Sequence, residues 1–333
     1  MHDGHSMVFC ITFLRFLAAC LITNAHYTGI YPTDLIANGG LLGDVLFFAV
    51  SGYCLANVKY ELSIKGFCKW FGKRIWRIYP SVLVATAIFM LLGYYSLGEH
   101  NAFWWFCYPT GYHFVASIIV LYIPYFWIMR MDATRKNIPW IMLAVGIVYL
   151  GIYCLFYDKS HYHIDTVREP MIRFLFGESL LLGAWFRIHD AGIRNHFKWW
   201  LLPVGIGLFG VYFLAKVMFS RNALPSQLQF LNQVILFALL FCIFHLAVGG
   251  DHGLERLPGI VRKCISFISS ITLEIYVVQY VLIGVVRDWR LPFPLNWIAV
   301  TSVILLSAFV LHQVCHWLQL VIDQTIEKSV SAS

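Results

Sequence analysis

Long hydrophobic runs, separated by short polar segments, dominate the pattern of the chain. Each run contains about 17–24 residues, and an α-helix needs about 20 apolar residues to cross the hydrocarbon core of a membrane. We therefore expect an all-α, polytopic integral membrane protein with about ten transmembrane helices. The runs lie near residues 7–27, 41–58, 78–96, 112–130, 138–157, 171–187, 199–218, 229–249, 265–286 and 295–318.

The connections between the runs are short, and the sequence shows no internal repeat or low-complexity stretch. We expect a single membrane domain over residues 1–333, with no appended soluble domain. The N-terminal run lacks the basic n-region and the small-residue cleavage site that signal peptides carry. It is therefore predicted to be a retained transmembrane helix.

The composition favours the same class of protein. The chain is 60% hydrophobic and 12% charged, with a mean hydropathy of +0.71, which is too apolar for a soluble protein of 333 residues. Nine cysteines are scattered through the sequence, most of them in apolar runs, without the spacing of metal ligands. We therefore expect neither disulfides nor a metal site.

Lys and Arg are distributed unevenly between the connecting segments. The segment 59–77 alone carries six of them, and others fill the loops near 130–137, 187–198 and 250–264. Cytoplasmic loops of membrane proteins are enriched in Lys and Arg, so we predict that both termini are cytoplasmic. The net charge of +7 follows from this asymmetry and gives no reason to expect nucleic acid as a partner.

Two ionisable side chains, Arg15 and His26, stand out in the first run. Their spacing corresponds to three helical turns plus roughly 20°, so both lie on one helix face, about 16 Å apart along the axis. Placing Arg in hydrocarbon costs several kcal/mol, and such residues are usually functional. With the predicted orientation, Arg15 lies at mid-depth and His26 lies at the extracytoplasmic end.

The second run begins with the motif GDVLFFAVSGY, which places Asp44 at its start and Ser51 deeper in the membrane. The loop from the first run is short, so Asp44 and His26 are expected at the same membrane face. A carboxylate there orients an imidazole and raises its basicity. The alternative is a carboxylate that stabilises a helix N-terminus through the helix dipole, and the sequence favours neither explanation.

The segment KRIWRIYP places Arg74 and Arg77 at the cytoplasmic mouth of the third run. Residues three apart lie on the same side of a helix, and guanidinium groups bind phosphate through paired hydrogen bonds. A nucleotide with several phosphates therefore fits this pair. Anchoring to anionic lipid headgroups is the alternative, and for a basic cluster taken alone it is the better explanation.

Further polar side chains lie deep in the later runs, where such groups usually face the interior of a helix bundle. The candidates for a channel or substrate contact are Arg173, Glu178, Glu274, Tyr276 and Gln279. His312 and His316 share a helix face, but no third ligand for a zinc site is apparent. We interpret this histidine pair as structural hydrogen bonders.

Taken in order, these motifs resemble the membrane acyltransferase-3 family. The motifs are Arg15-x10-His26, the G-D-x-x-F-F-x-x-S-G-Y run from Gly43 to Tyr53, and Arg74-x-x-Arg77-I-Y-Pro80. The stretch ISSITLEIYVVQ is similar to the late S-x-x-I-Y-x-x-H segment of the family. The chain departs from the family at Gln279, where a His is common, so the role of that His cannot be carried over.

The resemblance implies a surface-glycan O-acetyltransferase-like enzyme in a bacterial inner membrane. Such an enzyme moves an acyl group, most often acetyl, from cytoplasmic acyl-CoA to a hydroxyl of an extracytoplasmic saccharide or lipid-linked sugar. The acyl-CoA is a co-substrate, and no bound cofactor is expected. The resemblance implies His26 as general base with Asp44 as its helper, and Arg15 along the thioester path. The implied acyl-CoA-binding residues are Ser51, Arg74 and Arg77.

The main alternative is a membrane transporter or flippase for a saccharide or lipid-linked precursor, without acyl transfer. In that case Arg15 and His26 form a substrate or proton pathway, and Glu178 is a coupling site. Many transporters contain corresponding helices broken by Gly or Pro in two repeated halves, and the sequence shows no such pair. The combined motifs therefore favour the acyltransferase.

Overall fold

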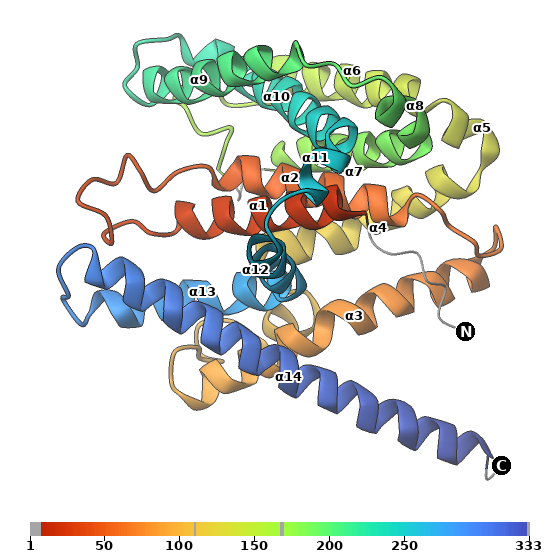
Figure 1. The fold of residues 1–333 in the computed structure, drawn as a ribbon, viewed down its shortest axis with the longest axis vertical. Helices are drawn as coiled ribbons and strands as arrows, with labels where there is room; N and C mark the ends of the chain where they lie inside the picture. The colour runs from red at the N-terminus through yellow and green to blue at the C-terminus, as the bar shows by residue number, and fades with distance from the viewer. Residues whose placement is uncertain (1–7, 110, 167–169, 332–333) are drawn as a thin grey trace. The chain divides into compact units, whose positions relative to one another are not determined.

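The computed structural model describes residues 8–109, 111–166 and 170–331, and within these ranges every regular element is a helix (Figure 1). This finding confirms the predicted all-α class. The ten predicted runs overlap α1 (Phe9–Ala25), α2 (Gly40–Leu55), α3 (Ile64–Leu91), α4 (His113–Arg130), α6 (Ile138–Phe156), α7 (Ile172–Ile188), α9 (Leu201–Ser220), α10 (Phe230–Gly249), α13 (Thr272–Arg287) and α14 (Leu295–Ser331). Shorter helices between them are η1 (Phe103–Cys107), α5 (Asp132–Lys136), α8 (Asp190–Asn195), η2 (Ser226–Leu228), α11 (Asp251–Glu255) and α12 (Gly259–Ser270).

Six of the described helices are long and apolar enough to cross a membrane, namely α3, α4, α6, α9, α10 and α14. A seventh span results if α12 and α13 are taken together, although they are bent by 72° at their junction. α1 and α2 are apolar but contain only 17 and 16 residues. The structure therefore supports a polytopic membrane protein, while the count of ten spans and the side of each terminus stay predictions.

α3 is longer than the sequence predicts. It begins at Ile64 rather than near residue 78, so the basic segment before the apolar run is helical as well. Pro80 lies inside this helix without ending it. The structure therefore places Arg74 and Arg77 on a helix that continues into the apolar part of the chain.

The predicted run 265–286 is divided into α12 and α13. Ser270 and Thr272 flank the junction, and their hydroxyls donate hydrogen bonds to backbone carbonyls of α12 over 2.7 and 2.9 Å. Side-chain hydrogen bonds of this kind compete with the backbone bonds of a helix and favour a bend. The polar side chains of α13 therefore begin directly after this bend.

The helices form two compact units. The first unit comprises residues 1–18, 41–67 and 117–266, and the second comprises residues 19–40, 68–116 and 267–333. Within the first unit α9 and α10 lie side by side, as α13 and α14 do within the second (Figure 1). This grouping does not test the predicted single domain, which stays a prediction.

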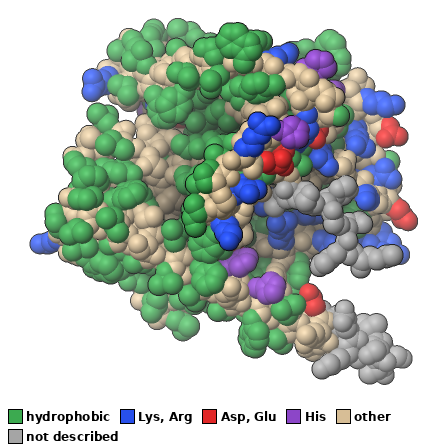
Figure 2. Space-filling model, in the orientation of Figure 1, with side chains coloured by type: hydrophobic (Ala, Val, Ile, Leu, Met, Phe, Trp, Pro, Cys, Tyr) green, Lys and Arg blue, Asp and Glu red, His purple; other side chains and the backbone are tan. Residues whose placement is uncertain are grey.

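Large apolar side chains cover the outer side of α9, among them Leu202, Ile206 and Leu214. Figure 2 shows hydrophobic side chains spread over much of the visible surface. An apolar surface of this extent marks a region that contacts lipid or a partner rather than water. The exposed apolar side chains, like the lengths and compositions of the helices, thus indicate a membrane protein.

α2 and α7 cross at close range in the first unit. A Cβ atom built on Gly52 would lie 1.8 Å from the carbonyl oxygen of Leu180, and one built on Gly183 would lie 1.8 Å from that of Ala49. Glycine permits membrane helices to approach this closely because it has no side chain. Gly52 of the motif GDVLFFAVSGY therefore has a packing role.

Replacing Gly52 by alanine is expected to destabilise the protein, because the added methyl group overlaps a backbone carbonyl. Overpacking typically costs about 1–3 kcal/mol, and we expect the upper end of this range. Thermal unfolding in detergent measures the effect. Gly210→Ala on α9 is the matched control, since no atom lies within 4 Å of the added Cβ. Equal stability of the two variants would contradict the packing role.

Candidate functional site

The predicted site residues are divided between the two units. The first unit contains Arg15, Asp44, Ser51, Arg173 and Glu178. The second unit contains His26, Arg74, Arg77, Glu274, Tyr276 and Gln279. The predicted general base and the predicted phosphate-binding pair thus belong to the same unit, and α13 supplies the remaining three residues of that set.

Glu274 is the buried centre of a hydrogen-bonded cluster in the second unit. Ser81 of α3 donates its hydroxyl proton to Oε1 of Glu274 over 2.9 Å. Nδ1 of His312 on α14 lies 3.2 Å from the same oxygen. A buried carboxylate needs such partners because burying an unpaired charge is costly. His312, which we predicted to be a structural hydrogen bonder, is therefore bonded to a predicted site residue.

His26 directly follows the last residue of α1 and is exposed. Its ring meets that of Tyr280 edge-on, with the ring centroids 6.4 Å apart. Thr23, three residues earlier, donates a hydrogen bond to Oε1 of the buried Gln279 over 2.7 Å. The end of α1 therefore contacts two consecutive residues of α13, Gln279 and Tyr280.

Tyr276 has a structural partner at the start of α4. The backbone N–H of Phe114 donates a hydrogen bond to the Tyr276 hydroxyl oxygen over 3.1 Å. The first N–H groups of a helix have no partner within the helix, so this hydroxyl caps α4. The rings of Phe114 and Tyr112 lie 5.7 and 6.3 Å from that of Tyr276. Its contact with a channel or substrate stays a prediction.

Arg74 and Arg77 lie on one stripe of α3 that also includes Trp70 and Ser81, and we call these four residues the basic stripe. The Arg74 guanidinium lies 5.8 Å from the centroid of the Trp70 ring, a cation–π contact. Arg77 is exposed. Ser81 follows Arg77 by one turn, so the Glu274 cluster begins about 6 Å further along the helix axis.

Arg15 lies in the middle of α1 and is half-buried. Its Nη2 atom is 3.7 Å from Sγ of Cys54 on α2. Sulfur is a weak hydrogen-bond acceptor, so this contact offsets only part of the cost of placing a guanidinium among apolar helices. Ser51, one turn before Cys54 on α2, is also half-buried. The catalytic role of Arg15 and the donor-binding role of Ser51 stay predictions.

Asp44 is buried within α2. The helix begins at Gly40, so Asp44 lies beyond the first turn rather than at the helix start. Stabilisation of a carboxylate by the helix dipole falls off within the first turn, which weakens the purely structural explanation of this residue. His26 belongs to the other unit, and its pairing with Asp44 stays a prediction.

Arg173 and Glu178 both lie on α7 but have different surroundings. Arg173 is exposed near the start of the helix, whereas Glu178 is half-buried. The Oε1 atom of Glu178 is buried and accepts no hydrogen bond from any described residue. A buried carboxylate oxygen without a partner is costly, and intramembrane carboxylates are usually functional. Glu178 is therefore the stronger candidate of the two for a channel or substrate contact.

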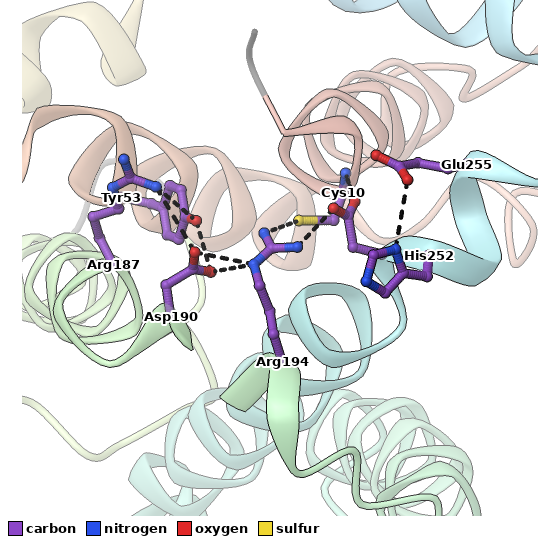
Figure 3. Close-up of polar contacts among 8 residues, drawn as sticks. Cys10, Tyr53, Arg187, Asp190, Arg194, His252 and Glu255 are labelled. Atoms are coloured by element: carbon purple, nitrogen blue, oxygen red, sulfur yellow. Dashed lines mark hydrogen bonds and ion pairs between the residues drawn. The ribbon is translucent and has the colours of Figure 1, made fainter. Parts of the chain in front are cut away.

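The first unit also contains a polar cluster that the sequence did not reveal (Figure 3). We call it the Arg194 cluster, and its members are Tyr53, Arg187, Asp190, Arg194 and Asp251. Nε of Arg194 lies 3.0 Å from both oxygens of Asp190, and Nη1 lies 2.7 Å from Oδ2 of Asp251. Burial lowers the pKa of Arg194, but the hydrogen bonds to the two carboxylates outweigh this effect and raise the pKa above its ordinary value.

The Arg194 cluster holds the start of α1 and the end of α2. Oδ1 of Asp251 accepts the backbone N–H of Cys10, in the first turn of α1, over 2.6 Å. Tyr53, the last residue of the motif GDVLFFAVSGY, donates to Asp190 over 2.9 Å and accepts from Arg187 over 3.2 Å. The sequence signals only the acidic and basic pair within α8, at the i,i+4 spacing, because the other partners are distant in the chain.

The helices and their polar side chains define the class of protein. At least six described helices can cross a membrane by length and composition, and ionisable side chains lie within the helical segments, as in integral membrane proteins. The family model of the acyltransferase-3 acyltransferase domain matches residues 8–313. The chain therefore belongs to this family, which confirms the resemblance, and it is a membrane acyltransferase. No curated protein and no solved structure matches the chain.

Proposed function

We propose that this acyltransferase moves an acetyl group from cytoplasmic acetyl-CoA to a hydroxyl of an extracytoplasmic saccharide, in a bacterial inner membrane. The arrangement of the second unit along α13 carries the proposal. Near the start of α13, Glu274 is bonded to Ser81 of the basic stripe, and further along Tyr280 meets His26. One helix thus contacts the basic stripe at Ser81 and the imidazole of His26, with the two contacts about 9 Å apart along its axis.

The basic stripe supports an acyl-CoA as the donor. Acyl-CoA carries several phosphates, and the guanidinium groups of Arg74 and Arg77 bind phosphate through paired, charge-assisted hydrogen bonds. α3 continues from this pair into the apolar part of the chain. The acyl arm of a bound donor can therefore lie along this helix. Ser51 is assigned to donor binding as well, in keeping with its place in the family motif.

His26 is assigned as the general base of the transfer. Its imidazole takes the proton of the acceptor hydroxyl while the hydroxyl oxygen attacks the thioester carbonyl. A positioned base of this kind contributes about 10²–10⁴-fold to the rate. Arg15 is assigned to polarise the thioester carbonyl, and Asp44 is assigned to hold the imidazole in the tautomer that accepts the proton. The products are a saccharide ester and the CoA thiol.

Acyl transfer by the purified protein in nanodiscs tests this function. Radiolabelled acetyl-CoA is supplied with lipid-linked oligosaccharide, and thiol release and label in the saccharide are measured together. We expect thiol release that depends on the saccharide and equals ester formation. Thiol release without ester formation would contradict the saccharide acceptor. A folded protein that releases no thiol with any acceptor would contradict the proposed donor and reaction.

A saccharide transporter or flippase without acyl transfer is the second candidate, and one observation favours it. The buried Glu178 oxygen that accepts no hydrogen bond from the described residues is typical of a coupling site. Proteoliposomes separate the two functions. Saccharide movement that proceeds without acyl-CoA would support the transporter, whereas ester formation without net movement of unmodified saccharide would exclude it.

A further inference from the structure

The Glu274 cluster contains an imidazole that the proposed mechanism does not use. His312 lies on α14, and its Nδ1 atom is 3.2 Å from Oε1 of Glu274. The Glu274 side chain is 8% exposed, whereas that of His312 is 36% exposed. A buried carboxylate that bonds one ring nitrogen of this partly exposed side chain leaves the other nitrogen for a proton transfer.

The cluster is assembled from three helices of the second unit. Ser81 of α3 donates to the Glu274 oxygen over 2.9 Å, and the buried Cys315 lies one turn after His312 on α14. The groups that are bonded to one another in this cluster are therefore Ser81, Glu274 and His312. Because the carboxylate also accepts the Ser81 proton, its position against the imidazole is fixed from two sides.

The cluster lies beside the segment that we assign to the donor. Gln319 of α14 donates to the Trp76 carbonyl of α3 over 2.9 Å, while His312 is linked to Ser81 through Glu274. α14 therefore runs antiparallel to α3 along the basic stripe. We place the sulfur of a donor whose phosphates bind the arginines of that stripe deeper in the unit, on the side of Ser81.

We propose that His312 is the general acid that protonates the CoA sulfur as it leaves, an inference that rests on the acyltransferase function proposed above. The acceptor oxygen forms a bond to the acyl carbon and gives its proton to His26. The C–S bond breaks, its electron pair passes to sulfur, and the proton on Nε2 of His312 moves to that sulfur. The products are the ester, the CoA thiol, neutral His312 and protonated His26, and proton exchange with water restores both rings.

The physical reason is the surroundings of the leaving group. Burial disfavours the charged form of a thiol, so expelling a thiolate among apolar helices is more costly than in water. An imidazolium held by Glu274 supplies the proton at the moment the bond breaks, and no isolated thiolate forms. The alternative is a hydrogen bond that only ties α14 to α13. Such a role needs a polar side chain at position 312 but no transferable proton.

His312→Gln separates these two roles, because glutamine can bond to Glu274 but cannot donate a proton as an acid. We expect kcat for acetyl transfer to fall about 100-fold, with the KM for acetyl-CoA and the thermal stability unchanged. In the native protein, a general acid makes the rate decrease at high pH, because the acid loses its proton. The His312→Gln variant should not show this decrease. His316→Gln, one turn further on the same helix and exposed, is the matched control and should retain the native rate and pH profile.

Glu274→Gln provides a second test that does not depend on the folding of the first variant. Glutamine retains an acceptor for Ser81 but removes the carboxylate that holds the imidazole, so kcat should fall while the KM for acetyl-CoA and the thermal stability stay unchanged. Native kcat in folded His312→Gln, or native kcat in folded Glu274→Gln, would overturn the inference and leave the proposed function intact. Absence of transfer in the native protein would overturn both.

Discussion

Replacement of His26 by alanine is expected to abolish acetyl transfer while leaving acetyl-CoA binding intact. Alanine cannot take the proton of the acceptor hydroxyl, and loss of a general base lowers the rate by about 10²–10⁴-fold. The basic stripe that is assigned to the donor lies on α3, whereas His26 follows α1 and is exposed. Single-turnover transfer measures the chemical step, and titration with acetyl-CoA measures binding separately.

The matched control is His100→Ala. His100 is an exposed histidine of the same unit, and its ring stacks on that of Trp104 with the centroids 3.7 Å apart. Its loss is expected to leave transfer unchanged. A His26→Ala variant that transfers acetyl at the native rate would refute the assigned base. If the His26→Ala variant also lost acetyl-CoA binding, His26 would be assigned to donor recognition rather than to catalysis.

The second large effect is expected from the double substitution Arg74→Ala with Arg77→Ala, which should weaken acyl-CoA binding about 100-fold or more. Hydrogen bonds to charged groups contribute about 1.5–3 kcal/mol each, and the pair removes several of them. Affinity is measured by titrating acetyl-CoA and free CoA into native and variant protein in nanodiscs of neutral lipid. Both ligands should lose affinity equally, because the arginines are assigned to the phosphates and not to the acyl group.

Arg262→Ala with Lys263→Ala is the matched control for the double substitution. Both residues are exposed on α12, a helix outside the proposed donor site. Their substitution removes the same number of positive charges as the Arg74 and Arg77 substitutions. Native affinity is expected for this control. Equal affinity in both double variants would contradict the proposed donor site and would leave anchoring to lipid headgroups as the better explanation of the basic stripe.

The helices were largely predictable because hydrophobic length is a local property of a sequence. Each of the ten predicted runs overlaps a helix. The errors occurred where a helix depends on more than apolar length. The basic start of α3 is polar, so hydrophobic length predicts a helix only from about residue 78, although α3 begins at Ile64. The ninth run is long and hydrophobic enough to predict one continuous helix, yet the hydroxyls of Ser270 and Thr272 accompany a bend between α12 and α13.

The candidate site was predictable only as a set of residue types. The sequence predicted Glu274 as a polar group in a span and His312 as half of a histidine pair, but not the bond between them. The Arg194 cluster was missed altogether, since its contacts join residues as far as 137 positions apart, and the Asp251 cap on Cys10 joins residues 241 apart. Periodicity describes which residues share a face of one helix and gives no information on which helices meet.

The sequence by itself determined the all-helical class, the places of the ten hydrophobic segments and the motifs of the acyltransferase-3 family. These follow from apolar length, helical spacing and residue identity, which need no knowledge of distant contacts. Only the tertiary structure decided that Glu274 joins Ser81 to His312, that Gln279 binds Thr23, and that Gly52 must be small. Partners of buried polar groups and close helix crossings are set by packing between elements, where burial makes an unsatisfied group or an added methyl group costly.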